Sequence, residues 1–129
     1  MTKYISKATV LAIHQDQIDR FGGSHGIRDE GLLEAAIFRP QTGYYRDLIE
    51  EAAALWESLS QNHPFIDGNK RAAFGSLCAF LGANGAPLQA NVEEAMAFVT
   101  GLYESNSFRF DQLVSWLREH TTLPKILNS

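Results

Sequence analysis

The fold of this chain is decided by residues 72–81, AAFGSLCAFL, which contain no charged side chain. Every residue in this stretch is apolar or small, so a helix built from it has no polar face. Such a helix is stable only where other helices surround it, and its glycine and alanine residues let those neighbours approach closely. The stretch therefore predicts a buried helix over about residues 69–81, at the centre of a helical domain.

Amphipathic segments on both sides of this stretch supply the surrounding helices. Their apolar residues recur at spacings of three and four, and two of them start with a capping box, at Asp47 and at Asn91. The segments run over about residues 6–21, 29–37, 47–59, 91–102 and 110–117. They predict an all-α fold, with about six helices around the buried central one. Residues 39–46, RPQTGYYR, fit either a loop or a small hairpin.

Length and composition limit the possible functions. The 129 residues fit one domain, 1–129, and 45% hydrophobic with 20% charged residues is typical of a globular protein. A net charge of -4 argues against direct binding of nucleic acid. The chain has no long apolar segment, so we expect no signal peptide, and its one cysteine, Cys78, cannot form an internal disulfide. We therefore expect a cytoplasmic protein with a buried thiol and no membrane contact.

An anion site is predicted at the start of the central helix, within residues 63–71, HPFIDGNKR. Free backbone amides at a helix N-terminus, together with the helix dipole, favour a phosphate. Gly68 allows the backbone to turn and to approach a ligand closely. Lys70 and Arg71 are adjacent cations in an acidic chain, and they lie where phosphates would arrive.

The same loop carries a candidate base and a candidate metal ligand. His63 can accept a proton from a hydroxyl near neutral pH, and the Asp67 carboxylate is a hard oxygen ligand suited to Mg²⁺. These groups together indicate phosphoryl or nucleotidyl transfer. Each also has a purely structural reading: Asn69 as an N-cap, Phe65 as a core anchor, and Asp-Gly as a turn.

The motif HPFIDGNKR resembles the Fic-domain signature H-x-F-x-[D/E]-G-N-x-R, which opens the active-site helix of that family. Residues 26–41, GIRDEGLLEAAIFRPQ, are similar to the family's upstream segment, and the helical order matches over nearly the whole chain. Lysine at position 70 resembles the death-on-curing (Doc) branch, the toxins of toxin–antitoxin pairs. Fic proteins that transfer AMP usually have glycine there.

The resemblance implies a role for each matching residue. His63 would deprotonate a Ser or Thr hydroxyl of a target protein, and Asp67 would hold Mg²⁺. ATP would be bound by the residues that follow the base: Phe65, Gly68, Asn69, Lys70 and Arg71. A target flap, possible as a small hairpin, would align the target's main chain by strand-like pairing. It would comprise Arg39, Gln41, Thr42, Gly43 and Tyr44.

Two departures from the AMP-transferring proteins favour a kinase. Phe74 stands where those proteins usually carry a second arginine, and the Lys70 side chain fills space that glycine leaves open. The Doc branch is similar in both respects, and its members are understood to transfer the γ-phosphate of ATP to elongation factor Tu. We therefore expect a toxin that phosphorylates this translation factor. The alternatives are an AMP transferase and a non-catalytic helical module that binds proteins.

A partner in trans is also expected. Self-inhibited Fic proteins carry an [S/T]-x-x-x-E-[G/N] helix, and the nearest match here, from Thr100 to Glu104, has Ser105 at the last position. Inhibition within the chain is therefore not expected. The resemblance implies a cognate antitoxin whose disordered tail folds into a groove on the toxin.

Overall fold

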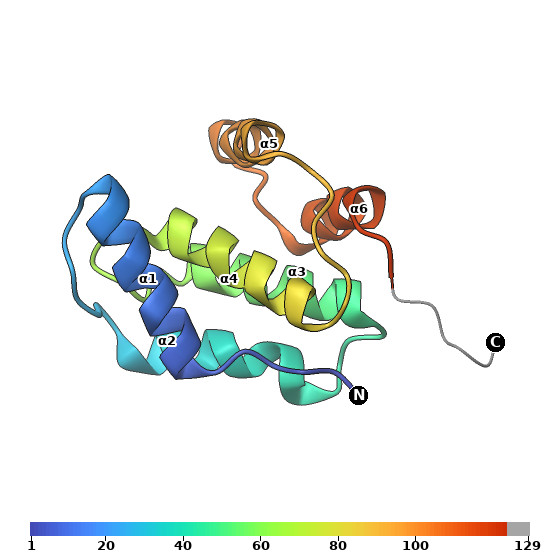
Figure 1. Cartoon of the computed structure of the whole chain (residues 1–129), viewed down its shortest axis with the longest axis horizontal. Helices are drawn as coiled ribbons and strands as arrows, with labels where there is room; N and C mark the ends of the chain where they lie inside the picture. Colours follow the sequence, from blue (N-terminus) through green and yellow to red (C-terminus); the bar gives the residue numbers. More distant parts are fainter. Residues whose placement is uncertain (124–129) are drawn as a thin grey trace.

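Six α-helices and one short 3₁₀-helix form the computed structural model, which describes residues 1–123 (Figure 1). In chain order they are α1 (Lys7–Phe21), α2 (Glu30–Phe38), the 3₁₀-helix η1 (Arg39–Thr42), α3 (Leu48–Gln61), α4 (Asn69–Ala83), α5 (Val92–Glu104) and α6 (Phe110–His120). Residues 1–123 contain two isolated β-bridges but no β-strand. The predicted all-α fold is confirmed. The last six residues of the predicted domain, 124–129, lie outside the described part.

The helix starts follow the capping residues. Ser6, Asp29, Asp47 and Asn91 each accept a hydrogen bond from the amide three residues further on. The capping box at Asp47 is incomplete, however. The Glu50 carboxylate accepts hydrogen bonds from the amide and the guanidinium of Arg46 rather than from the amide of Asp47. Local chemistry therefore sets where these helices begin.

The centre of the molecule contains two buried helices rather than one. No side chain of α4 between residues 71 and 81 is exposed, as predicted. In α3 every residue from Ile49 to Ser60 is buried or half-buried, although the sequence predicted only a buried stripe. Helix α3 packs against α4 on one side and against α2, η1 and α6 on others. These additional helices cover the face of α3 that the sequence predicted to be polar and exposed.

Helix α5 is set apart from the other helices, at the top of Figure 1, and aromatic side chains connect it to the bundle. The Trp56 ring on α3 lies 6.0 Å from Phe74, 6.2 Å from Phe98 and 5.8 Å from Trp116, measured between ring centroids. These four residues belong to α3, α4, α5 and α6. Trp56 is therefore the common contact of the four helices.

Cys78 is half-buried on α4, where the sequence predicted a buried thiol. Its side chain lines an apolar cavity beside α5, and burial raises the pKa of the thiol to about 11. None of the helices in the described residues has the length and apolar character needed to cross a bilayer.

Candidate functional site

The loop between α3 and α4 makes a sharp turn at Gly68, immediately before the first residue of α4. Gly68 has φ of +75°, and a Cβ on this residue would lie 2.9 Å from the Cδ1 atom of Ile18. The backbone angle therefore favours glycine, and any larger residue would also have to displace the end of the Ile18 side chain. Gly68 has no side chain to cap the helix, so the first-turn amides of α4 remain available to an anion.

Asn69 holds the loop closed and is not the N-cap. Its side-chain amide donates to the carbonyl of Phe65 at 3.0 Å, and its side-chain oxygen accepts from the amide of Phe65 at 2.9 Å. Gly68 occupies the N-cap position instead. The Asn69 side chain thus stabilises the backbone of the loop.

Phe65 is a core residue. Its side chain is 1% exposed and its ring is stacked on His14, with 3.8 Å between centroids. The prediction that Phe65 contacts the nucleotide is therefore wrong for its side chain, and the core-anchor reading is correct. His14 also bonds the loop directly, because its Nε2 lies 2.7 Å from the carbonyl oxygen of Asp67.

A second segment, residues 22–29 between α1 and α2, lies against this loop. The amide of Ile66 donates to the carbonyl of Gly26, and the amides of Arg28 and Asp29 donate to the carbonyl of Pro64. These bonds form a short antiparallel contact centred on the bridge between Ile27 and Phe65. In Figure 1 both segments lie at the same end of the molecule, on the left.

The predicted target flap falls on a different loop. Residues 39–42 form η1 and not a hairpin, and Arg39 is held by the side chains of Tyr45, Glu57 and Ser58. Helix α2 starts beside the site loop and carries the chain about 13 Å away before residue 39. The lining of the site cavity also contains none of the other predicted flap residues, which are Gln41, Thr42, Gly43 and the exposed Tyr44. The chain beside the site is residues 22–29.

Asp67 is an exposed carboxylate held in place by backbone amides. Oδ2 accepts from the amide of Ser24 at 3.2 Å and Oδ1 accepts from the amide of Gly68 at 2.8 Å. These bonds hold the pKa of Asp67 below its ordinary value. Gly23 in the neighbouring loop has φ of +116°, which favours glycine, and a Cβ there would lie 2.7 Å from Oδ2. Asp67 is therefore ionised at neutral pH.

A cavity of about 460 Å³ brings the predicted polar residues together. It is lined by His63, Ile66, Asp67, Gly68, Asn69, Lys70, Arg71, Met96, Val99 and Thr100. This lining includes the six polar or glycine residues that the sequence analysis assigned to the site: His63, Asp67, Gly68, Asn69, Lys70 and Arg71. The opposite wall comes from α5, which the sequence did not predict. No local signal marks these α5 residues, because Met96 and Val99 have the spacing of ordinary core positions.

The two cations of the cavity are held differently. Lys70 is exposed, and its ammonium lies 4.0 Å from the ring centroid of Tyr103 on α5, a cation–π contact. The Arg71 guanidinium donates to the carbonyls of Gln17 and Gly22 at the end of α1, at 3.3 and 3.0 Å. Arg71 therefore joins α1 to α4 while also lining the cavity. The Lys70 ammonium, held by no hydrogen bond among the described residues, can move more freely than the Arg71 guanidinium.

Asp67 is the candidate ligand for Mg²⁺ in this cavity. The described residues contain no group of three or more His, Cys, Asp or Glu side chains that could hold a metal ion by themselves. Mg²⁺ does not need one, because it usually takes one or two carboxylates and completes its shell with waters and substrate phosphates. An exposed, ionised carboxylate beside free helix amides fits that pattern.

Comparison with known proteins gives consistent matches. The family model described as the Fic/DOC family matches residues 4–81. The chain is 43% identical over 98 residues to "Toxin Doc" of Mycolicibacterium smegmatis, covering 72% of this chain and 73% of that protein. It is 37% identical over 87 residues to "Protein kinase doc" of Escherichia phage P1, covering 64% of this chain and 69% of that protein. The family model spans the site loop and residues 22–29, which pack against it, but ends before α5.

Proposed function

The chain belongs to the Fic/DOC family, and we propose that it is a toxin that transfers the γ-phosphate of ATP to a Ser or Thr hydroxyl of a translation factor. Elongation factor Tu is the proposed target, and the cytoplasm is the proposed place of action. The observation that carries the proposal is the cavity in which His63, Asp67 and Lys70 meet at the uncapped start of α4. The printed names of the two relatives, a toxin and a protein kinase, support it.

The proposed reaction is a direct transfer. The target hydroxyl oxygen forms a bond to the γ-phosphorus while the bond from this phosphorus to the β–γ bridging oxygen breaks, and ADP leaves. The hydroxyl proton passes to the imidazole of His63, which is exposed in the cavity. The amides of Asn69 to Arg71 and the Lys70 ammonium offset the phosphate charge, and most of the rate comes from positioning.

Asp67 is the residue that would hold Mg²⁺ with the nucleotide. The ion would supply neutralisation of phosphate charge beyond what the two cations provide. The low pKa of Asp67 keeps the carboxylate available for this contact across the neutral range. Transfer is therefore expected to depend on added Mg²⁺.

Phe74 favours phosphate transfer over AMP transfer. Its ring packs against Trp56 and lines the apolar cavity next to the site, so the side chain at this position carries no charge with which to bind a terminal phosphate. Lys70 already extends over the cavity towards Tyr103. Both observations support the kinase over the AMP transferase, which is the second candidate.

Labelled ATP separates the two reactions. We expect purified elongation factor Tu to acquire label from γ-labelled ATP and none from α-labelled ATP when the protein and Mg²⁺ are present. Omission of Mg²⁺ should abolish the label, and an unrelated acceptor protein serves as the control. Label from α-labelled ATP with none from γ-labelled ATP would replace phosphorylation by AMP transfer.

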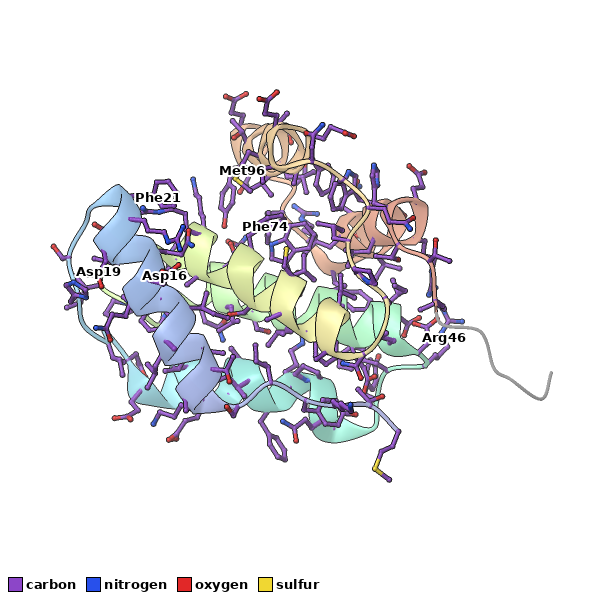
Figure 2. All side chains as sticks on the ribbon, viewed as in Figure 1. Asp16, Asp19, Phe21, Arg46, Phe74 and Met96 are labelled. Carbon is purple, nitrogen blue, oxygen red and sulfur yellow. The ribbon has the colours of Figure 1, made fainter. Side chains whose placement is uncertain are left out.

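The second cavity supplies a groove for the proposed antitoxin tail. It has a volume of about 460 Å³ and lies between α1, α4 and α5, and its lining is mostly apolar. Figure 2 shows Phe74 on α4 and Met96 on α5 on the sides of the two helices that face each other. Arg20 and Arg71 add positive charge to this lining, so a tail with apolar and acidic residues suits it.

A further inference from the structure

His63 has an unusual backbone conformation. Its φ is +49°, in the left-handed region that few non-glycine residues adopt. Among the described residues the only other such case is Asn106, and asparagine tolerates this region well. A histidine there persists only where its surroundings hold it. The conformation determines the direction in which the His63 side chain leaves the chain.

Arg28 binds the backbone on both sides of the His63 α-carbon. Its Nε donates to the carbonyl of His63 at 2.6 Å, and one terminal nitrogen donates to the carbonyl of Asn62 at 2.8 Å. The guanidinium is planar and rigid, so two such bonds fix the orientation of both carbonyls. The carbonyls follow the last turn of α3, where a positive charge is favourable.

The backbone of Arg28 is itself anchored to the next residue of the loop. Its amide donates to the carbonyl of Pro64 at 2.7 Å, and the amide of Asp29 shares that carbonyl at 3.0 Å. Arg28 therefore binds three consecutive carbonyls, those of Asn62, His63 and Pro64. No salt bridge involves Arg28 within residues 1–123. Its side-chain bonds all go to the loop that carries the base.

We propose that Arg28 is a positioning residue that holds His63 in its left-handed conformation and so directs the imidazole into the cavity. This inference rests on the proposed role of His63 as the base. It assigns to Arg28, within residues 22–29, the function of shaping the catalytic loop through a side chain that does not itself line the cavity.

The kinetic test uses two substitutions in the full chain. Arg28→Ala should lower kcat for phosphate transfer by about 10- to 100-fold, because a small misplacement of a catalytic group has effects of this size. The KM for ATP should stay unchanged, because the phosphate-binding groups do not depend on Arg28. Arg28→Lys should lose kcat as well, since one ammonium cannot reproduce the fork. Full activity of the lysine variant would overturn the proposal.

A conformational test separates this inference from the proposed function. In isotope-labelled protein, the amide-to-Hα coupling and the Cβ chemical shift of His63 report its φ by NMR. Both should move away from left-handed values in Arg28→Ala and stay in place in Arg109→Ala, which changes an exposed arginine at the start of α6. An unchanged His63 in Arg28→Ala would overturn the inference. A moved His63 in a protein that transfers no phosphate would support it and refute the function instead.

Discussion

His63→Ala should reduce phosphate transfer by about 10²- to 10⁴-fold, the usual contribution of a general base. The imidazole is exposed in the cavity and belongs to no part of the hydrophobic core, so its removal leaves the packing unchanged. The initial rate of label transfer from γ-labelled ATP measures the effect. The thermal unfolding midpoint should match that of the unaltered protein.

The matched control is His25→Ala. His25 is also exposed, but it is paired with Asp19 at 3.1 Å and lies outside the cavity lining. Its loss should leave transfer unchanged. If His63→Ala kept its transfer rate, the assignment of the base would be wrong. If it lost transfer but still arrested growth as strongly as the unaltered chain, the non-catalytic binding module would be favoured.

Trp56→Ala should lower the free energy of unfolding by about 3–5 kcal/mol, the range for deleting a large buried aromatic side chain. Trp56 is 1% exposed and contacts aromatic rings of α4, α5 and α6. Its removal leaves a cavity where four helices meet. Urea unfolding followed by circular dichroism measures the loss.

A second substitution covers the case in which Trp56→Ala does not fold. Trp56→Phe keeps a ring in the same place, so a smaller loss is expected and the protein should fold. Tyr44→Ala removes an aromatic ring that is 82% exposed and should change stability little. Equal losses for Trp56→Phe and Tyr44→Ala would contradict the assigned role of Trp56.

Much of the fold was predictable because helix starts and ends depend on neighbouring residues. Asp47 and Asn91 cap helices in the structure, as the capping boxes in the sequence indicated. The burial of α4 followed from its lack of charged residues between 72 and 81. The almost complete burial of α3 did not follow from its pattern. It results from other helices packing against α3 on several sides at once, and the spacing of apolar residues within α3 does not indicate these contacts.

The site was predictable where its residues are contiguous. Asp67 and Lys70 line the cavity together because they lie on one loop and the first turn of one helix. Phe65 was misassigned because its side chain points to the core and stacks on His14. The α5 wall and the segment beside the loop come from distant parts of the chain, so no motif could indicate them.

The sequence by itself determined the all-α fold, the helix starts and the polar groups at the start of α4. These properties depend on residues that lie a few positions apart in the sequence, so local patterns can indicate them. The tertiary structure decided what faces those groups: residues 22–29 against the loop, and α5 across the cavity. It also decided the backbone of His63, because Arg28, which bonds the carbonyl of that residue, comes from the segment between α1 and α2.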